Sequence, residues 1–293
     1  LPPNMSAPKP CLRLGLAGGG FSPTTTPLTN NSLNSSPPPT FDAGDYDGDG
    51  DLDVVCIWGE WPPMHLLRND GVGGFLNVTF ASGIAWGVAS AHQARLADLD
   101  GDGLLDVVVA AVPPDAPYSW LRNTGGGSFL PPAALPSAGI ISSSDRRPVV
   151  ADFDGDGLKD VLLVGSPSAS LPGGAVDTIA LARQTSPGVF AAAGTVPFAP
   201  GALPFRQTVA TAADLNGDGD AELIVAGERG TAMFDYVGGA FVPLGPEIPA
   251  PGMGLAAFDA DGDADIDVLV EQGFYGPRTR YRMLINSGVA GFE

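Results

Sequence analysis

Five short acidic loops carry most of the side chains in this sequence that could do chemistry. The first reads DYDGDGDLD from Asp45, and DLDGDGLLD, DFDGDGLKD, DLNGDGDAE and DADGDADID begin at Asp98, Asp152, Asp214 and Asp259. Carboxylates crowded in this way raise one another's pKa and repel unless a cation neutralises them. Oxygen ligands at alternating positions suit a hard ion, and a flexible loop with many ligands favours Ca²⁺ over Mg²⁺. The loops therefore predict up to five bound calcium ions.

Each nine-residue loop offers its ligands at the same five positions. Side-chain oxygens at positions 1, 3, 5 and 9 and the backbone carbonyl at position 7 are assigned to the ion. The predicted ligands are Asp45, Asp47, Asp49, Asp51, Asp53, Asp98, Asp100, Asp102, Leu104, Asp106, Asp152, Asp154, Asp156, Leu158, Asp160, Asp214, Asn216, Asp218, Asp220, Glu222, Asp259, Asp261, Asp263, Asp265 and Asp267. Glycine at positions 4 and 6 permits a backbone with positive φ. The fifth loop departs from this pattern, because Ala264 replaces its second glycine.

An EF-hand also begins with D-x-D-x-D-G, but it needs a bidentate Glu at position 12 and a helix on each side. Position 12 is apolar or cysteine in every loop: Cys56, Val109, Leu163, Val225 and Val270. Short runs of β-branched residues follow the loops, as in a buried strand. Each loop is therefore predicted to join two strands. The alternative is a set of acidic, solvated surface turns that bind no metal.

Charge and composition limit the function classes. The net charge is -19, but the loops hold 22 of the 33 acidic residues, which leaves 11 against 14 Lys and Arg. We expect no nucleic-acid partner, because no basic patch exists to displace counterions. The 41 Gly and 29 Pro residues fall between regularly spaced apolar runs, where they indicate turns. This pattern predicts an all-β protein.

A second repeated element combines a strand, a Gly-rich turn and a phenylalanine, as in LLRNDGVGGF and WLRNTGGGSF. Together with small apolar segments before each loop, it gives four strands per unit of about 45 to 60 residues, which is the pattern of a β-propeller. We predict five loop-bearing repeats plus a partial N-terminal repeat, forming one domain over residues 11–293. Residues 1–10 are predicted to be a linker, and 22–40 an exposed Pro/Ser/Thr-rich excursion. The N-terminal strands would complete the last blade, or the chain would be a segment of a longer propeller.

On these motifs the sequence resembles the FG-GAP/VCBS repeat family, the calcium-loop β-propellers of integrin α-subunit heads and of many secreted proteins. The D-x-D-G-D-G-x-x-D loop and the L-x-N-x-G-x-G-x-F element span residues 11 to 293. The resemblance implies the fold and the metal. The chain departs from the integrin type by lacking a Gly-Ala-Pro tripeptide, by Asn216 and Glu222 in loop 4, and by Ala264 in loop 5. These differences argue against an integrin-like receptor.

Several features predict an extracellular place. No apolar run is long enough for a membrane span. The two cysteines, Cys11 and Cys56, are predicted to form a disulfide bond in an oxidising compartment. Asn-x-Ser/Thr sequons are predicted N-glycan acceptors; they lie at Asn4, Asn30, Asn34 and Asn77.

The function predicted first is an adhesion, interaction or assembly module with a protein or glycan partner. A lectin is the alternative, with tryptophans stacking on sugars, and a polysaccharide lyase is third. The tryptophans are Trp58, Trp61, Trp86 and Trp120, and Trp61 in the connection 59–65 is expected at the surface. We expect no enzyme activity, because the chain offers only His65 and His92 and no known catalytic motif. His65 is expected to be structural, whereas a role for His92 stays open.

Overall fold

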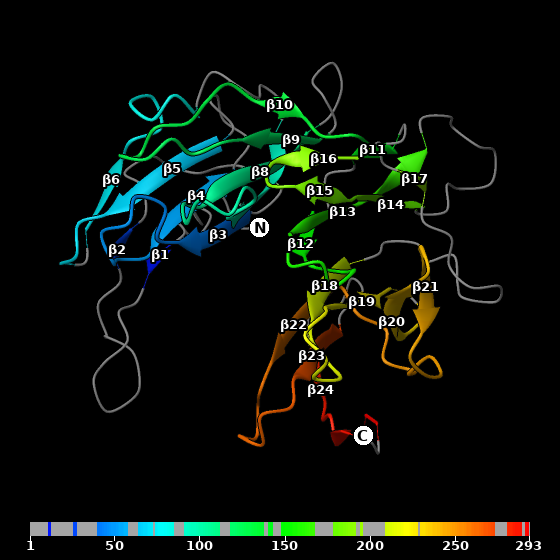
Figure 1. Ribbon diagram of the computed structural model, residues 1–293. Coiled ribbons are helices and arrows are strands. Elements are labelled where there is room, and N and C mark those ends of the chain that lie inside the picture. Colours follow the sequence, from blue (N-terminus) through cyan, green and yellow to red (C-terminus); the bar gives the residue numbers. More distant parts are fainter. Residues whose placement is uncertain are drawn as a thin grey trace, which may run out of the picture.

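The computed structural model of the protein describes residues 11–12, 26–27, 40–57, 64–72, 74–84, 91–111, 118–137, 140–142, 148–167, 178–191, 194–195, 209–227, 229–272, 280–288 and 291–292. Every named element in these residues is a β-strand, and every pairing is antiparallel. Figure 1 shows five small sheets that form the blades of a β-propeller. The predicted fold class is confirmed.

Three blades have four strands in sequence order. Blade 1 consists of β3 (Thr40–Gly44), β4 (Asp53–Ile57), β5 (Met64–Asn69) and β6 (Phe75–Asn77). Blade 2 consists of β7 (Ala91–Ala97), β8 (Asp106–Ala111), β9 (Tyr118–Leu121) and β10 (Ala133–Ala134). Blade 4 consists of β18 (Val209–Ala213), β19 (Glu222–Ala226), β20 (Thr231–Val237) and β21 (Ala240–Pro243).

Blades 3 and 5 vary this plan. Blade 3 consists of β12 (Val149–Ala151), β13 (Asp160–Pro167), β14 (Thr178–Ala182) and β17 (Gly194–Thr195), with β11 (Ile140–Ser142) paired to the far end of β13. It also carries a hairpin of β15 (Gln184–Ser186) and β16 (Val189–Phe190). Blade 5 has three strands, β22 (Gly254–Phe258), β23 (Asp267–Gln272) and β24 (Arg280–Leu284).

The first strands of the blades lie side by side. Contacts join β3 to β7, β7 to β12, β12 to β18 and β18 to β22, and Figure 1 shows the blades following one another in an arc. Four of them, β7, β12, β18 and β22, contain the small apolar segments that precede the Asp loops in the sequence. Each Asp loop connects the first strand of a blade to its second strand. The five loops therefore occupy equivalent places in the fold.

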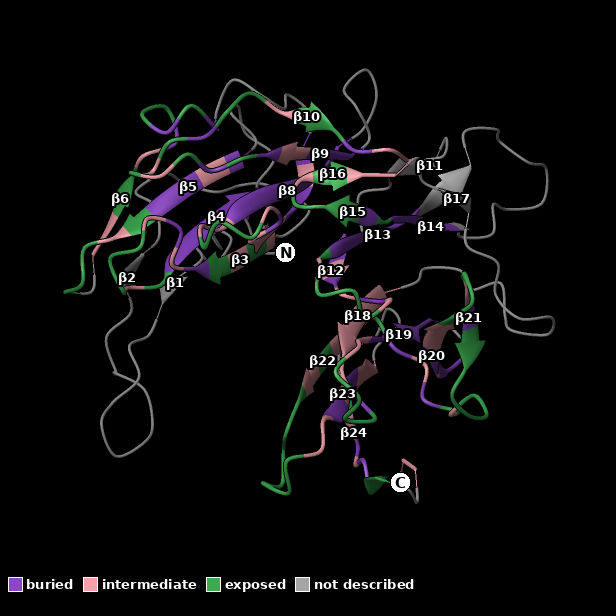
Figure 2. Ribbon diagram, in the orientation of Figure 1, coloured by how far each residue is buried: buried purple, intermediate pink, exposed green. Residues whose placement is uncertain are grey.

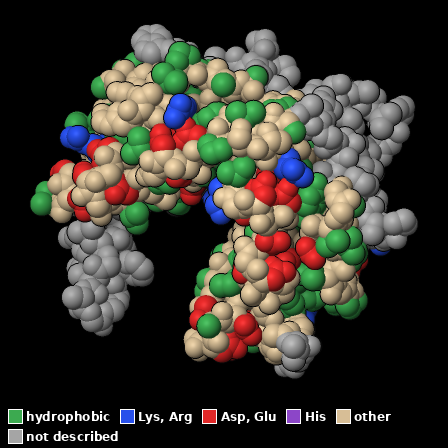
Figure 3. Space-filling view, in the orientation of Figure 1, with side chains coloured by type: hydrophobic (Ala, Val, Ile, Leu, Met, Phe, Trp, Pro, Cys, Tyr) green, Lys and Arg blue, Asp and Glu red, His purple; other side chains and the backbone are tan. Residues whose placement is uncertain are grey.

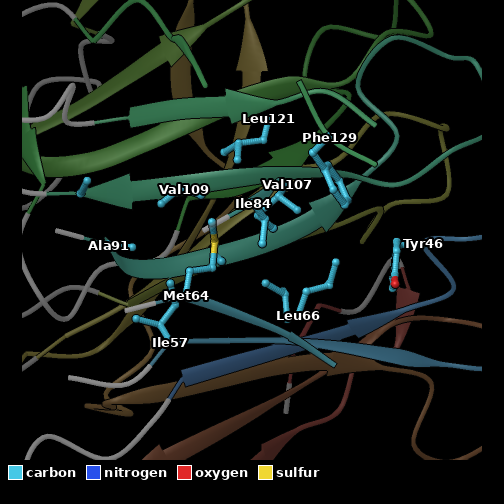
Figure 4. Close-up of a cluster of buried hydrophobic side chains, with 13 residues drawn as sticks. Tyr46, Ile57, Met64, Leu66, Ile84, Ala91, Val107, Val109, Leu121 and Phe129 are labelled. Atoms are coloured by element: carbon cyan, nitrogen blue, oxygen red, sulfur yellow. The ribbon is translucent and has the colours of Figure 1, made fainter. Parts of the chain in front are cut away.

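The core lies between neighbouring blades. The second strands β4, β8 and β19 are buried along their whole length (Figure 2). Side chains of a strand alternate between its two faces. In β8, Val107 and Val109 therefore pack with blade 1, whereas Val108 and Ala110 pack with blade 3. Figure 4 shows the first of these interfaces, where Val109 of blade 2 lies near Met64 of blade 1.

The N-terminal strands do not complete the last blade. Within the described residues, β1 (Cys11–Leu12) and β2 (Thr26–Pro27) pair with each other and form a separate two-stranded sheet. Strand β2 also lies inside the stretch 22–40 that was predicted to be an excursion. Most of that stretch and all of 1–10 lie outside the described residues. Among the elements described, none is a helix of the length and apolarity that a membrane span requires.

Two local predictions are corrected. Cys56 is a free, buried thiol in the middle of β4, so the disulfide bond predicted with Cys11 is not formed. Its side chain packs with Val54 and Leu67 in a small apolar cluster. The connection predicted over 59–65 is shorter than expected, because Met64 is already a buried residue of β5.

Candidate metal centre

The first aspartate of each loop folds the loop around its own carboxylate. Asp45 Oδ1 accepts a hydrogen bond from the backbone N–H of Gly48 at 2.8 Å, and its Oδ2 accepts one from Gly50 at 2.9 Å. The same two bonds recur in the other loops, at Asp98, Asp152, Asp214 and Asp259. Gly48 and Gly50 have φ of 80° and 93°, values that glycine reaches without a Cβ clash. The loop geometry is thus built by the chain itself.

Ala264 adopts the same backbone conformation as the glycines it replaces. Its φ is 75°, and it is the only non-glycine residue with positive φ in the part of the chain that the structure describes. Its N–H still donates to Asp259 Oδ2 at 3.2 Å. A left-handed conformation costs a non-glycine residue about 1–2 kcal/mol. The backbone of the fifth loop therefore follows the same path as that of the other loops, but it is strained at Ala264.

Four loops bring three acidic side chains close enough to share one ion. In each group, one carboxylate oxygen from every member lies within 4.8 Å of the others. The groups are Asp45, Asp47 and Asp53; Asp98, Asp100 and Asp106; Asp152, Asp154 and Asp156; and Asp259, Asp261 and Asp263. Loop 4, with Asn216 at position 3, forms no such group among the described residues. Figure 3 shows acidic side chains gathered in separate patches on the face in view.

The last acid of each loop is buried and accepts hydrogen bonds from backbone N–H groups of its blade. Asp53 accepts a hydrogen bond from the N–H of Asn69 on Oδ1 at 2.8 Å and from that of Tyr46 on Oδ2 at 3.2 Å. Asp106, Asp160 and Asp267 accept corresponding pairs of bonds. Burial raises the pKa of Asp53 and Asp106 to about 6.

Glu222 fills the last position of loop 4, and its carboxylate is held differently. Oε2 accepts a hydrogen bond from the N–H of Leu215 at 2.6 Å, and Oε1 accepts one from the side-chain amide of Asn216 at 3.0 Å. Burial raises the pKa of Glu222 to about 7, as it does for Asp160 in loop 3. These buried carboxylates favour a nearby cation, which would keep them ionised.

Two position-3 acids have an oxygen that no donor satisfies. Oδ1 of Asp100 in loop 2 and Oδ1 of Asp154 in loop 3 are buried without a hydrogen-bond partner. A buried polar atom in this state is rare unless water, an ion or another ligand contacts it. Both atoms belong to three-acid groups. The oxygen-only donor set and these unsatisfied atoms fit a hard divalent cation.

Arginines lie beside the first three loops, and sequence reasoning missed them. Arg122 forms an ion pair with Asp100, and Arg183 Nε lies 3.1 Å from Asp154 Oδ2. Arg68 is 3.9 Å from Asp47 in loop 1. The sequence pattern that could have revealed them is the repeated strand element, in which an Arg follows the apolar residues of the third strand. A single arginine leaves most of the acidic charge of each loop unbalanced.

Family comparison covers all five loops. FG-GAP-like repeats match residues 45–109, 98–163 and 214–270, and each match runs from the first aspartate of one loop through the whole of the next. The chain belongs to the FG-GAP-like repeat family. No curated protein matches the sequence significantly.

Solved structures resemble this FG-GAP-like propeller at low sequence identity. A lectin from Agrocybe aegerita, described as recognising non-reducing terminal N-acetylglucosamine, is 20% identical with a TM-score of 0.64, over 97% of this chain and 72% of that chain. An α-L-arabinanase of Penicillium chrysogenum is 11% identical with a TM-score of 0.36, over 82% and 90% of the two chains. The Aleuria aurantia lectin is 13% identical with a TM-score of 0.39, over 87% and 93%. The first likeness shows a shared fold.

Other predicted sites fall partly within this FG-GAP-like propeller. Asn77 is exposed, and its side-chain amide lies 3.3 Å from His65 Nδ1 on the neighbouring strand. The half-buried His92 accepts a hydrogen bond from Thr40 through its backbone carbonyl. Trp120 is half-buried and packs against Phe190. The remaining predicted tryptophans and sequons lie outside the described residues: Trp58, Trp61, Trp86, Asn4, Asn30 and Asn34.

Proposed function

We propose that the Asp loops bind Ca²⁺, up to one ion each, and that the ions hold the turns of the blades rigid. The observation that carries this proposal is the clustering of three acids within 4.8 Å in four of the five loops. The unsatisfied Oδ1 atoms of Asp100 and Asp154 support it, because an ion at the loop would contact them. Side chains at positions 1, 3, 5 and 9 and the carbonyl at position 7 would hold the ion.

Bound calcium would supply two positive charges where the chain has concentrated negative charge. An unfolded chain disperses these ligands, so binding favours the folded state. A site whose Kd is a hundredfold below the calcium concentration adds about 2.7 kcal/mol to the free energy of unfolding. Three such sites would equal the stability of a typical domain. Calcium would therefore be structural in this protein.

The role that fits this chemistry is an extracellular interaction or assembly module. The acids that cluster among the described residues belong to the loops, where they would be occupied by metal and not available for proton transfer. We therefore propose a binding protein and not an enzyme. An extracellular place fits a fold that depends on abundant calcium, and Asn77, the sequon asparagine within the described residues, is exposed.

The test counts ions and measures their effect on stability. After dialysis into trace calcium, elemental analysis should find at least three calcium ions per chain. Chelation should lower Tm steeply, and Mg²⁺ should restore little of the loss, because it keeps its waters and needs a strict octahedron. Glu247→Gln removes an exposed acid outside the loops and should change neither the count nor Tm. Coincident melting curves with and without calcium would refute the metal assignment.

Glycan binding is the second candidate function. The observation that favours it is Trp120, which lines a pocket together with charged side chains. The lectin from Agrocybe aegerita supports it through a shared fold. A glycan array probed in calcium, and again with calcium removed and restored, would test this function. Shortening of an oligosaccharide during incubation would instead indicate a lyase.

A further inference from the structure

A pocket of about 340 Å³ opens between blades 2 and 3. Its lining combines two charged side chains with apolar ones, and includes Asp100, Trp120, Arg122, Leu130, Pro131 and Pro187. Pockets from roughly 300 Å³ upward that combine aromatic walls with a few placed polar groups are typical small-molecule sites. One or two sugar rings would fit this volume.

Trp120 makes this pocket specific to blade 2. It stands opposite Val108 in the register of β9 on β8. Every other blade has an aliphatic or Met residue at the corresponding place: Leu66, Leu181, Met233 and Met283. The indole is half-buried, and it packs edge-on against Phe190 with ring centroids 6.0 Å apart. Its position is therefore held by the interface of blades 2 and 3.

The β15–β16 hairpin of blade 3 brings backbone close to the indole. A Cβ on Gly188 would lie 2.9 Å from the Trp120 ring and 3.3 Å from Asp100 Cβ, so this approach needs a residue without a side chain. Gly188 also has φ of 70°, which favours glycine. The hairpin thus forms one wall of the pocket beside the outer edge of the indole.

The polar end of the pocket is an ordered arginine between two carboxylates. Arg122 is half exposed and is held by its ion pair with Asp100 and by Asp102, whose Oδ2 lies 3.6 Å from Nη2. The Asp100 side chain is only 6% exposed. Both carboxylate oxygens of Asp100 are buried, so Asp100 orients the guanidinium, which offers several donors in a fixed plane. An arginine held in this way suits the hydroxyl oxygens of a sugar ring.

Charge and shape select the class of ligand. Loop 2 has four acids, and their negative charge exceeds the positive charge of Arg122 and a bound Ca²⁺ together, which disfavours a phosphate or another anion. The charged end of the pocket disfavours a purely apolar ligand, because the polar groups of the pocket would lose their hydrogen bonds to water and gain none from the ligand. A neutral saccharide matches both halves, with its C–H face on the indole of Trp120 and its hydroxyls at the half-exposed guanidinium of Arg122. The geometry points to this pocket as a binding site for a neutral saccharide residue, an inference that rests on the second candidate function.

The experiment measures binding in excess calcium. Neutral mono- and disaccharides are titrated calorimetrically against the whole chain, starting with N-acetylglucosamine and then with hits from the glycan array. Trp120→Ala and Arg122→Ala should each weaken the Kd by about tenfold or more, which corresponds to the loss of one aromatic or charge-assisted contact. Arg68→Ala is the matched control, because Arg68 pairs with loop 1 but its blade has Leu66 in place of the tryptophan. It should leave the Kd unchanged.

A second variant distinguishes loss of the binding site from a folding defect caused by Trp120→Ala. Ala133 is exposed on the rim of the pocket, so Ala133→Arg should fill the pocket without disturbing the core, and should abolish binding at an unchanged Tm. Saccharide binding that survives both Ala133→Arg and Trp120→Ala would overturn the site while glycan binding stands. A wild-type protein that binds no saccharide would overturn the site and the glycan function, and would leave the calcium proposal intact.

Discussion

The side-chain amide of Asn123 donates a hydrogen bond of 2.7 Å to the backbone carbonyl of Tyr46, 77 residues earlier in the chain. Tyr46 belongs to loop 1, and Asn123 follows the third strand of blade 2. The same amide group donates to Leu105 in loop 2 at 3.0 Å. Asn286 repeats the arrangement between blades 4 and 5, where it bonds to Leu215 at 2.8 Å. One buried amide thus ties an Asp loop to the loop of the next blade.

Replacing Asn123 should destabilise the whole fold. Asn123→Ala leaves the buried carbonyl of Tyr46 and the part-buried carbonyl of Leu105 without their donor, and a buried unsatisfied group costs about 1–3 kcal/mol. We expect the free energy of unfolding to fall by at least about 2 kcal/mol. Chemical denaturation in calcium measures it. Thr124→Ala is the control, because the bond of Thr124 to Ser128 is exposed. A loss no larger than that of the control would show that the bond between the blades is energetically neutral.

Loops 2 and 5 should differ in their response to mutation. Asp100→Asn should remove one calcium ion and about 2–3 kcal/mol of stability in excess calcium, because Asp100 is nearly buried with an unsatisfied oxygen. Asp263→Asn should cost less, because all three acids of that group are exposed and Ala264 strains the loop. Ion counts and Tm with and without chelator measure both effects. If Asp100→Asn lost as much stability in chelator as in excess calcium, its effect would not depend on calcium binding.

Ala264→Gly should stabilise the protein by about 1 kcal/mol. The substitution removes the strain of an alanine in the left-handed conformation at φ 75°. Part of this gain is offset, because glycine raises the conformational entropy of the unfolded chain. The gain should be present with and without calcium, since the strain lies in the backbone. Ala260→Gly in the same loop is the control and should destabilise, because Ala260 has no positive φ to relieve. A decrease in Tm for Ala264→Gly would contradict this account.

Without calcium, stability should fall as the pH rises. Burial raises the pKa of Asp160 from 3.8 to about 7 and that of Glu222 from 4.5 to about 7. Between these values the folded protein keeps protons that the unfolded chain has released, so raising the pH favours unfolding. Saturating calcium should remove or reverse this slope, because the ion requires ionised ligands. Urea denaturation at about pH 4.5 and about pH 7.5 tests it; greater calcium-free stability at the higher pH would refute it.

The sequence was sufficient to place the Asp loops and the strands beside them. A nine-residue loop that hydrogen-bonds to its own first carboxylate is decided by nearby residues, such as Asp45, Gly48 and Gly50. The small first strands and the apolar second strands follow from local patterns of side-chain size and burial. Both were recognisable without knowing which blades meet.

Tertiary structure decided the contacts between blades. Asn123 and Tyr46 are far apart in the chain, and only the packing of blade 2 on blade 1 brings them together. The packing of blade 3 on the other side of blade 2 makes Trp120 the wall of a pocket, because the opposite wall comes from the hairpin around Gly188. Counting cysteines suggested a disulfide bond, but the alternation of side chains along β4 directs Cys56 into an apolar cluster. Local sequence decides which face of a strand is apolar, whereas the facing strand decides what each side chain contacts.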